Sequence, residues 1–325
     1  MSLTRAFTGL AYRAARPLAA LAARALPQRS NPGLRAYGIV ADLGLAPGRE
    51  AFASAVLESF FRSLLLQKHL ASLDPPGLHD FANRFVVFEG PMAPPRLFEE
   101  CRPLIFATPH YGAPLAALVV SAQLLRGRRT LNVFYDKRRH GEQLQVFFAR
   151  AGIRMHGQLT GLSGIRTSLR ALERGECVAL LPDAFEDIAQ TLVVPFFDRL
   201  LRAASGTAFL ALRSGALIVP TFATPEKRFG LRVLAGEPIE PARAAALDET
   251  QAIFLLTRLL FARIEEQLRF APEHWRNWEA LPQVSTPLGI RTELNDSQLL
   301  LALESRLRSL PPALQSIPEL ELLLS

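Results

Sequence analysis

The sequence is poor in cysteine and lysine, and its first thirty residues contain no long apolar run. Cys101 and Cys177 are the only cysteines among 325 residues, which excludes a disulfide framework and gives no zinc-binding pattern. Each cysteine lies beside an apolar run, so both are expected to be buried thiols. No apolar stretch near the N-terminus approaches the roughly 20 residues that a membrane-spanning helix needs.

Several catalytic signatures are also missing. The chain has no glycine-rich phosphate loop and no dinucleotide-binding fingerprint. The segment Gly161-Leu162-Ser163-Gly164 lacks the final spacing of a hydrolase nucleophile elbow. His140 and His156 stand alone, without a metal-ligand pattern. We therefore expect neither a cofactor nor a metal.

Arginine dominates the charged residues. The formal charge is +7, with 37 lysines and arginines against 30 acids, and only Lys68, Lys137 and Lys227 are lysines. Arginine binds phosphate through two parallel hydrogen bonds, so phospholipid, a phosphopantetheine thioester or an acidic carrier protein are plausible partners. The arginines are scattered and form no basic stripe with interleaved aromatics, which argues against nucleic acid.

Residues 1–30 form a distinct basic segment, with five arginines and no acid. Leu10, Ala14, Leu18 and Leu21 recur at helical spacing within it. This pattern predicts an amphipathic helix that lies on an anionic membrane surface. The alternative is a helix packed on the domain.

Strands and helices alternate through the middle of the chain. Apolar runs predict strands at 104–107, 131–135, 178–181, 217–222 and 231–234, and helices at 47–71, 114–125, 143–150, 163–174, 206–213 and 251–268. This alternation predicts an α/β domain over residues 31–282, with a mostly parallel sheet flanked by helices. Prolines break residues 283–325 into a C-terminal tail with one helical stretch.

Polar residues follow three of these strands, where sites form in parallel sheets. His110 lies between a predicted strand and the helix that Pro114 begins. The positive end of that helix favours a neutral imidazole, as a general base requires, and its N–H groups suit a developing oxyanion. Lys137, Arg138 and Arg139 follow the second strand, and Asp183 follows the third.

These segments resemble the bacterial lipid A late acyltransferases, within the lysophospholipid acyltransferase superfamily. His110-Tyr111-Gly112 resembles the start of that family's His-x-Gly-Asn-Trp-Glu motif, but Leu115 stands where the family has its acidic residue. The later blocks match in order and spacing: Leu180-Leu181-Pro182-Asp183, Val193 to Arg199, Ser205 to Ala216, Val219 to Phe222, and Pro272-Glu273-His274-Trp275.

The resemblance implies transfer of a fatty or polyketide acyl chain from a carrier-protein or coenzyme A thioester. The acceptor would be a hydroxyl or amine of a lipid or secondary metabolite. His110 would be the catalytic base, and Asp183, Glu186, Asp187 or Asp136 would supply the carboxylate that Leu115 lacks. Tyr111, Gly112, Arg199 and the basic block at 137–139 would bind substrate.

Because Leu115 removes the family's usual partner of the histidine, a second hypothesis remains open. The chain would then be a catalytically silent homologue that binds acyl chains, a carrier protein or the membrane as a scaffold. In either case we expect a cytoplasmic protein, peripheral on the inner membrane.

Overall fold

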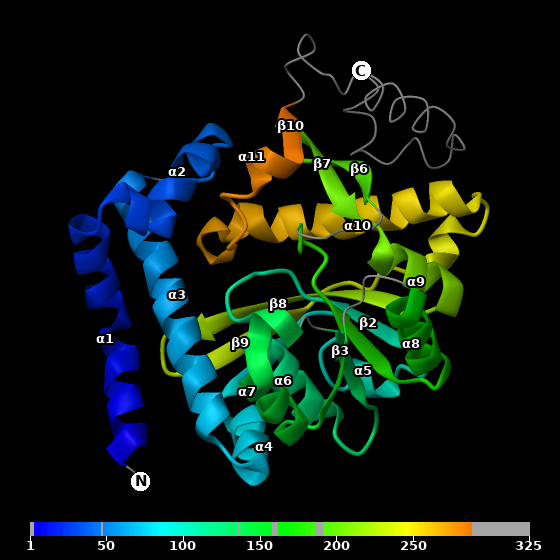
Figure 1. The fold of residues 1–325 in the computed structure, drawn as a ribbon, viewed down its shortest axis with the longest axis horizontal. Coiled ribbons are helices and arrows are strands. Elements are labelled where there is room, and N and C mark those ends of the chain that lie inside the picture. The colour runs from blue at the N-terminus through cyan, green and yellow to red at the C-terminus, as the bar shows by residue number, and fades with distance from the viewer. Residues whose placement is uncertain (1–2, 47, 135–136, 158–161, 186–190, 288–325) are drawn as a thin grey trace.

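The computed structural model describes residues 3–46, 48–134, 137–157, 162–185 and 191–287, without the side chains of residues 3–9, 137–143 and 162 (Figure 1). Within this part the helices are α1 Leu3–Ala25, α2 Pro32–Asp42, α3 Arg49–Ser72, α4 Pro75–Arg84, α5 Arg96–Glu99, α6 Pro114–Leu125, α7 Lys137–Arg150, α8 Leu162–Glu173, α9 Gly206–Ser214, α10 Glu249–Phe270 and α11 Leu281–Val284. Three 3-10 turns occur at η1 Gln28–Ser30, η2 Pro241–Ala244 and η3 Pro272–His274.

The strands form two sheets. They are β1 Val86–Glu89, β2 Leu104–Ala107, β3 Leu131–Phe134, β4 Ile153–His156, β5 Cys177–Leu180, β6 Thr191–Phe196, β7 Arg199–Ala204, β8 Leu217–Glu226, β9 Gly230–Ala235 and β10 Ser285–Pro287. The larger sheet has seven strands in the order β1-β9-β8-β2-β5-β3-β4, and only the β8–β9 pair is antiparallel. The smaller sheet, β10-β7-β6, is antiparallel. The expected α/β fold with a mostly parallel, helix-flanked sheet is thus confirmed.

The central strands β2 and β5 are apolar because both faces of the sheet are covered. Alternate side chains of β2 enter different cores: Ile105 packs with the side of α8, α9 and α10, and Phe106 with the side of α4, α6 and α7. The chain leaves β2 through α6 and reaches β8 from β5 through α9. These two connections cover opposite faces, so the carboxyl ends of β2 and β5 flank a switch point of the topology.

Helix α1 lies along α3 (Figure 1). Its buried face consists of Tyr12, Ala15, Ala19 and Ala23. The predicted apolar stripe lies elsewhere: Leu10, Leu18 and Leu21 are 68%, 52% and 65% exposed. The described part of this helix therefore packs on the domain through Tyr12 and three alanines, and it leaves Leu10, Leu18 and Leu21 in contact with solvent. Within the described residues, no helix is long and apolar enough to cross a membrane.

The two cysteines, both expected to be buried, differ in their exposure to solvent. Cys177 is buried, and burial raises the pKa of its thiol to about 11, but Cys101 is exposed because it precedes β2 instead of lying within it. The first residues of the predicted tail lie against the domain, since β10 pairs with β7. The predicted helical stretch at 299–307 lies outside the described residues.

Candidate functional site

The register of the central sheet determines where the two strand-end residues lie. Leu104 pairs with Cys177 and Ala107 with Leu180, and the ladder continues through a hydrogen bond from the Thr108 N–H to the Leu180 carbonyl. His110 and Asp183 each follow their strand by three residues. Both residues therefore lie at the same distance beyond the carboxyl ends of the paired strands. His110 Nδ1 lies 3.0 Å from Asp183 Oδ1.

Asp183 is fully buried and accepts hydrogen bonds from several donors. The backbone N–H of His110 donates to both carboxylate oxygens, at 3.0 and 2.9 Å. Trp275 Nε1 donates to Oδ2 at 2.7 Å, and Asn277 Nδ2 donates to the same oxygen at 3.1 Å. These donors satisfy the oxygens of a carboxylate that has no contact with solvent, and each donor offsets part of the lost hydration.

The carboxylate selects the imidazole tautomer. An ionised carboxylate only accepts hydrogen bonds, so Nδ1 of His110 carries the proton that faces Asp183. Asn277 Nδ2 lies 3.3 Å from the same nitrogen, but both amide hydrogens are used in shorter contacts to the Asp183 carbonyl and Oδ2. Nε2 therefore keeps its lone pair. The His110 side chain is 34% exposed, so part of the ring lies at the surface.

Residues 272–278, which we call the clamp loop, hold the backbone around His110. Arg276 donates its N–H to the His110 carbonyl at 3.0 Å, and Gly112 donates its N–H to the His274 carbonyl at 2.7 Å. Trp275 and Tyr111 form an isolated antiparallel bridge. Aromatic packing anchors the loop. The rings of Trp275 and Trp278 pack edge to face, with their centroids 4.7 Å apart.

Helix α3 supports this arrangement from the side. Ser63 Oγ donates to the Gly112 carbonyl at 2.9 Å, and Arg276 Nη2 donates to the same oxygen at 2.7 Å. Ser59 Oγ lies 2.8 Å from Nδ1 of His274. Burial lowers the pKa of His274 to about 4, so this second histidine is neutral at pH 7 and fixes the loop without adding charge.

The residues predicted to bind substrate have other contacts in the structure. Tyr111 is fully buried, and its hydroxyl accepts a hydrogen bond from Gln267 Nε2, so its side chain belongs to the core and does not line an open site. Gly112 adopts φ +58°, and a Cβ there would lie 2.0 Å from the Ala223 carbonyl oxygen. The Arg199 guanidinium donates to Oγ and to the carbonyl of Ser285 in β10. These hydrogen bonds join β7 to β10.

The remaining candidates lie where the structure gives no side-chain positions. Lys137, Arg138 and Arg139 begin α7, and their side chains are among those the structure does not describe. Asp136, Glu186 and Asp187 lie outside the described residues altogether.

Two backbone N–H groups between His110 and α6 are already bonded. The Gly112 N–H donates to His274 and the Ala113 N–H to the Ala223 carbonyl, at 2.7 and 2.9 Å. Pro114, the first residue of α6, has no N–H. These two groups are therefore not free to bind an oxyanion, because the clamp loop and β8 pass directly beside the turn.

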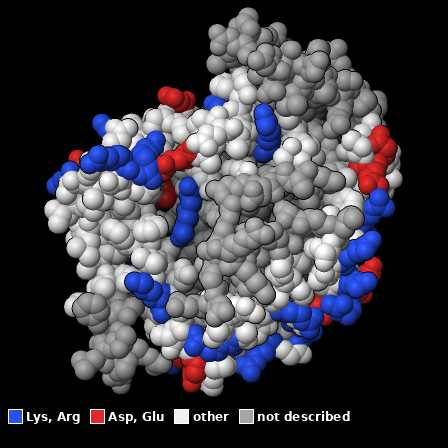
Figure 2. Space-filling view, in the orientation of Figure 1, with Lys and Arg blue, Asp and Glu red and all other residues white. Residues whose placement is uncertain are grey.

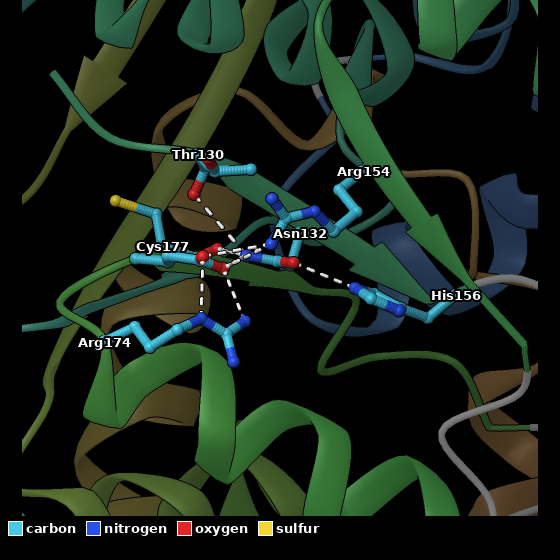
Figure 3. Close-up of polar contacts among 7 residues, drawn as sticks. Thr130, Asn132, Arg154, His156, Arg174 and Cys177 are labelled. Atoms are coloured by element: carbon cyan, nitrogen blue, oxygen red, sulfur yellow. Dashed lines mark hydrogen bonds and ion pairs between the residues drawn. The ribbon is translucent and has the colours of Figure 1, made fainter. Parts of the chain in front are cut away.

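A second polar cluster lies in β3, β4 and the start of β5 (Figure 3). Asn132 is buried and bridges Glu176, the Cys177 carbonyl and His156, with contacts of 2.8, 3.0 and 2.8 Å. Arg154 and Arg174 pair with Glu176, and the Arg174 hydrogen bonds are the main cause that lowers the pKa of Glu176 to about 2. These contacts join residues of β3 and β4 and the start of β5, so the cluster ties three strands together.

The basic charge is spread over the described surface. Figure 2 shows Lys and Arg side chains along the lower right rim and near the upper left corner, with acidic side chains among them. Many described arginines pair with carboxylates, as Arg102 does with Glu100 and Arg213 with Glu249.

Comparison of the sequence with known proteins identifies a family for the chain. No curated protein matches the sequence. The model of the bacterial lipid A biosynthesis acyltransferases matches residues 99–278, which is more than half of the chain. The match includes β2, β5, His110, Asp183 and the whole clamp loop. The chain belongs to the bacterial lipid A biosynthesis acyltransferase family.

Proposed function

We propose that this protein transfers an acyl chain from a carrier-protein or coenzyme A thioester to a hydroxyl or amine of a lipid or related metabolite. Family membership supports acyl transfer to a lipid in general. The observation that carries the finer proposal is the 3.0 Å contact between His110 Nδ1 and Asp183 Oδ1, because it leaves Nε2 as the basic nitrogen.

The chemistry follows from that tautomer. Nε2 of His110 removes the proton from the acceptor hydroxyl or amine, whose heteroatom attacks the thioester carbonyl carbon. The new C–O or C–N bond forms and the C–S bond breaks. The departing thiolate takes the proton back from Nε2, so the imidazole ends neutral. Asp183 stabilises the transient imidazolium while remaining ionised.

Leu115 does not prevent this mechanism. Its side chain is partly buried and packs against the apolar core on the α6 side of the sheet, where it cannot polarise an imidazole. In our proposal Asp183 takes over the orienting role from the neighbouring strand. The proposal thus accounts for the missing acidic residue without requiring loss of activity.

The test is a transfer assay with acylated carrier protein and acyl coenzyme A as donors and a panel of lipid acceptors. We expect consumption of at least one thioester and appearance of an acylated product. A His110→Ala variant serves as the control for background hydrolysis. Binding of acylated carrier protein without turnover in any combination would contradict the proposal and favour the scaffold hypothesis.

We further propose that α1 holds the protein on an anionic leaflet of the inner membrane, from the cytoplasmic side. Its outward leucines are more than half exposed, and Arg13 and Arg16 are exposed on the same helix. Apolar burial and basic residues, each contributing about 1 kcal/mol near an anionic surface, act together on such a helix.

Substitution of Leu10, Leu18 and Leu21 by serine is expected to weaken binding to anionic vesicles at least tenfold, because each exposed leucine loses apolar surface to bury. Vesicle sedimentation measures this effect. The substitutions spare Tyr12, whose hydroxyl donates to the Glu226 carbonyl, so the helix stays packed on the domain. A control with serine at Phe85, Val146 and Phe270, also exposed, should bind like wild type. Equal loss in both variants would contradict a specific role of α1.

A further inference from the structure

The two oxygens of the Asp183 carboxylate have different partners. Oδ1 faces the imidazole of His110. Oδ2 accepts from Trp275 and Asn277, both in the clamp loop. A carboxylate that rotated about its Cβ–Cγ bond would lose these contacts. The clamp loop therefore fixes the orientation in which Oδ1 points at Nδ1.

Asn277 contributes more to this arrangement than a single contact. Its amide nitrogen donates to the Asp183 carbonyl at 2.7 Å as well as to Oδ2 at 3.1 Å. The same side chain thus holds both the backbone and the carboxylate of Asp183. It also lies 3.3 Å from Nδ1 of His110, so it packs against the pair itself.

We propose that Asn277, assisted by Trp275, is a positioning residue that tunes the basicity of His110 through the Asp183 carboxylate. The proposal deepens the proposed function and rests on it for its effect on rate. Its effect on the imidazole itself is independent of which reaction the protein catalyses.

The direction of the effect follows from electrostatics. The amide hydrogen on Oδ2 draws negative charge away from Oδ1, which weakens the pull of Asp183 on a protonated imidazole. Without that donor, the carboxylate would hold the imidazolium more strongly. His110 would then stay protonated to a higher pH, and less of the base would be available in neutral solution.

The test compares Asn277→Leu with wild type by NMR titration of the histidine rings, with the His110 signals assigned from a His110→Gln spectrum. We expect the His110 titration midpoint to rise by roughly half to one pH unit. In the transfer assay, the acidic limb of the pH–rate profile should move upward by the same amount. At the plateau we expect kcat to fall on the order of tenfold, while KM stays within about twofold.

Asn31→Leu is the matched control. Asn31 is also fully buried, and its side chain accepts from the N–H groups of Gly33 and Leu34 at the start of α2. This variant should lose stability without moving the His110 midpoint or the pH profile. A merely structural role for Asn277 would give the same pattern, and that result would overturn the proposal.

Trp275→Phe keeps most of the aromatic packing but removes the other donor to Oδ2, so it tests the idea if Asn277→Leu does not fold. It should raise the His110 midpoint in the same direction, and an unchanged midpoint would overturn the proposal. A raised midpoint in a protein that transfers no acyl group would support the positioning role and contradict the proposed function.

Discussion

Asp183→Asn is expected to lower acyl transfer by about a thousandfold or more, with the fold retained. An asparagine at this position presents either an amide NH₂ or a neutral oxygen to His110 Nδ1. The NH₂ would drive the imidazole proton onto Nε2 and remove the lone pair that attacks the acceptor proton. The neutral oxygen would no longer stabilise the imidazolium. Loss of an orienting carboxylate in a comparable arrangement costs on the order of 10⁴ in rate.

Transfer rates of Asp183→Asn, His110→Ala and wild type would be compared, with circular dichroism as the check on folding. His110→Ala should lose roughly 10² to 10⁴ in rate. Asp198→Asn is a suitable control, because Asp198 is an exposed aspartate at the β6–β7 turn. Rates within a few fold of wild type for Asp183→Asn would show that another group orients His110.

Gly112→Ala should destabilise the protein by about 3 kcal/mol or more and displace His110. The new Cβ would lie 2.0 Å from the Ala223 carbonyl oxygen, on a backbone at φ +58°. The contact cannot relax by rotating a side chain, since the neighbour is backbone of β8. Relief requires movement of the turn that carries His110, so activity should fall further than stability alone explains.

Denaturant unfolding measures the stability loss, and the transfer assay measures the rate. Gly127→Ala separates the two causes, because Gly127 has φ +76° but a Cβ added there would meet nothing within 4 Å. We expect the free energy of unfolding of that variant to fall by about 1 kcal/mol, while its activity stays at the wild-type level. If the two substitutions lower the free energy of unfolding equally, the close approach of β8 to Gly112 is not the cause of the loss of stability.

Most of the central elements could be predicted from apolar periodicity. The expected segments at 104–107 and 114–125 match β2 and α6, because these elements are buried and their sequences carry strong signals. The β6–β7 hairpin, β1 and β4 were not predicted as strands. They are short or half exposed, so local composition does not separate them from loops.

The sequence predicted only those residues of the site that directly follow a strand. His110 and Asp183 both follow apolar runs, and their juxtaposition results from parallel pairing of those runs. Trp275 belongs to a block that resembles the family, but its contact with Asp183 spans 92 residues. Asn277 carries no sequence signal, since a single asparagine in a loop fits many roles.

For α1, the sequence did not determine which face of the helix is buried. The sequence offered two alternatives for this segment, packing on the domain or lying on a membrane. The structure shows the first, with Tyr12 and three alanines on the packed face and Leu10, Leu18 and Leu21 on the exposed face, and contact with a membrane stays a prediction. Periodicity identifies an apolar stripe, but it does not reveal which stripe the rest of the protein covers.

The ladder between β2 and β5 also limits how this chain tolerates changes in length. The spacing of 73 residues that pairs the strands is the same spacing that separates His110 from Asp183. Loops and helices between the two strands can lengthen or shorten without moving the pair, since hydrogen bonds and not chain length set the register. One residue inserted or deleted between Ala107 and His110, or between Leu180 and Asp183, would turn one side chain away from the other. Relatives with very different spacing between their histidine and aspartate can therefore keep the same pair, provided that these two short segments stay intact.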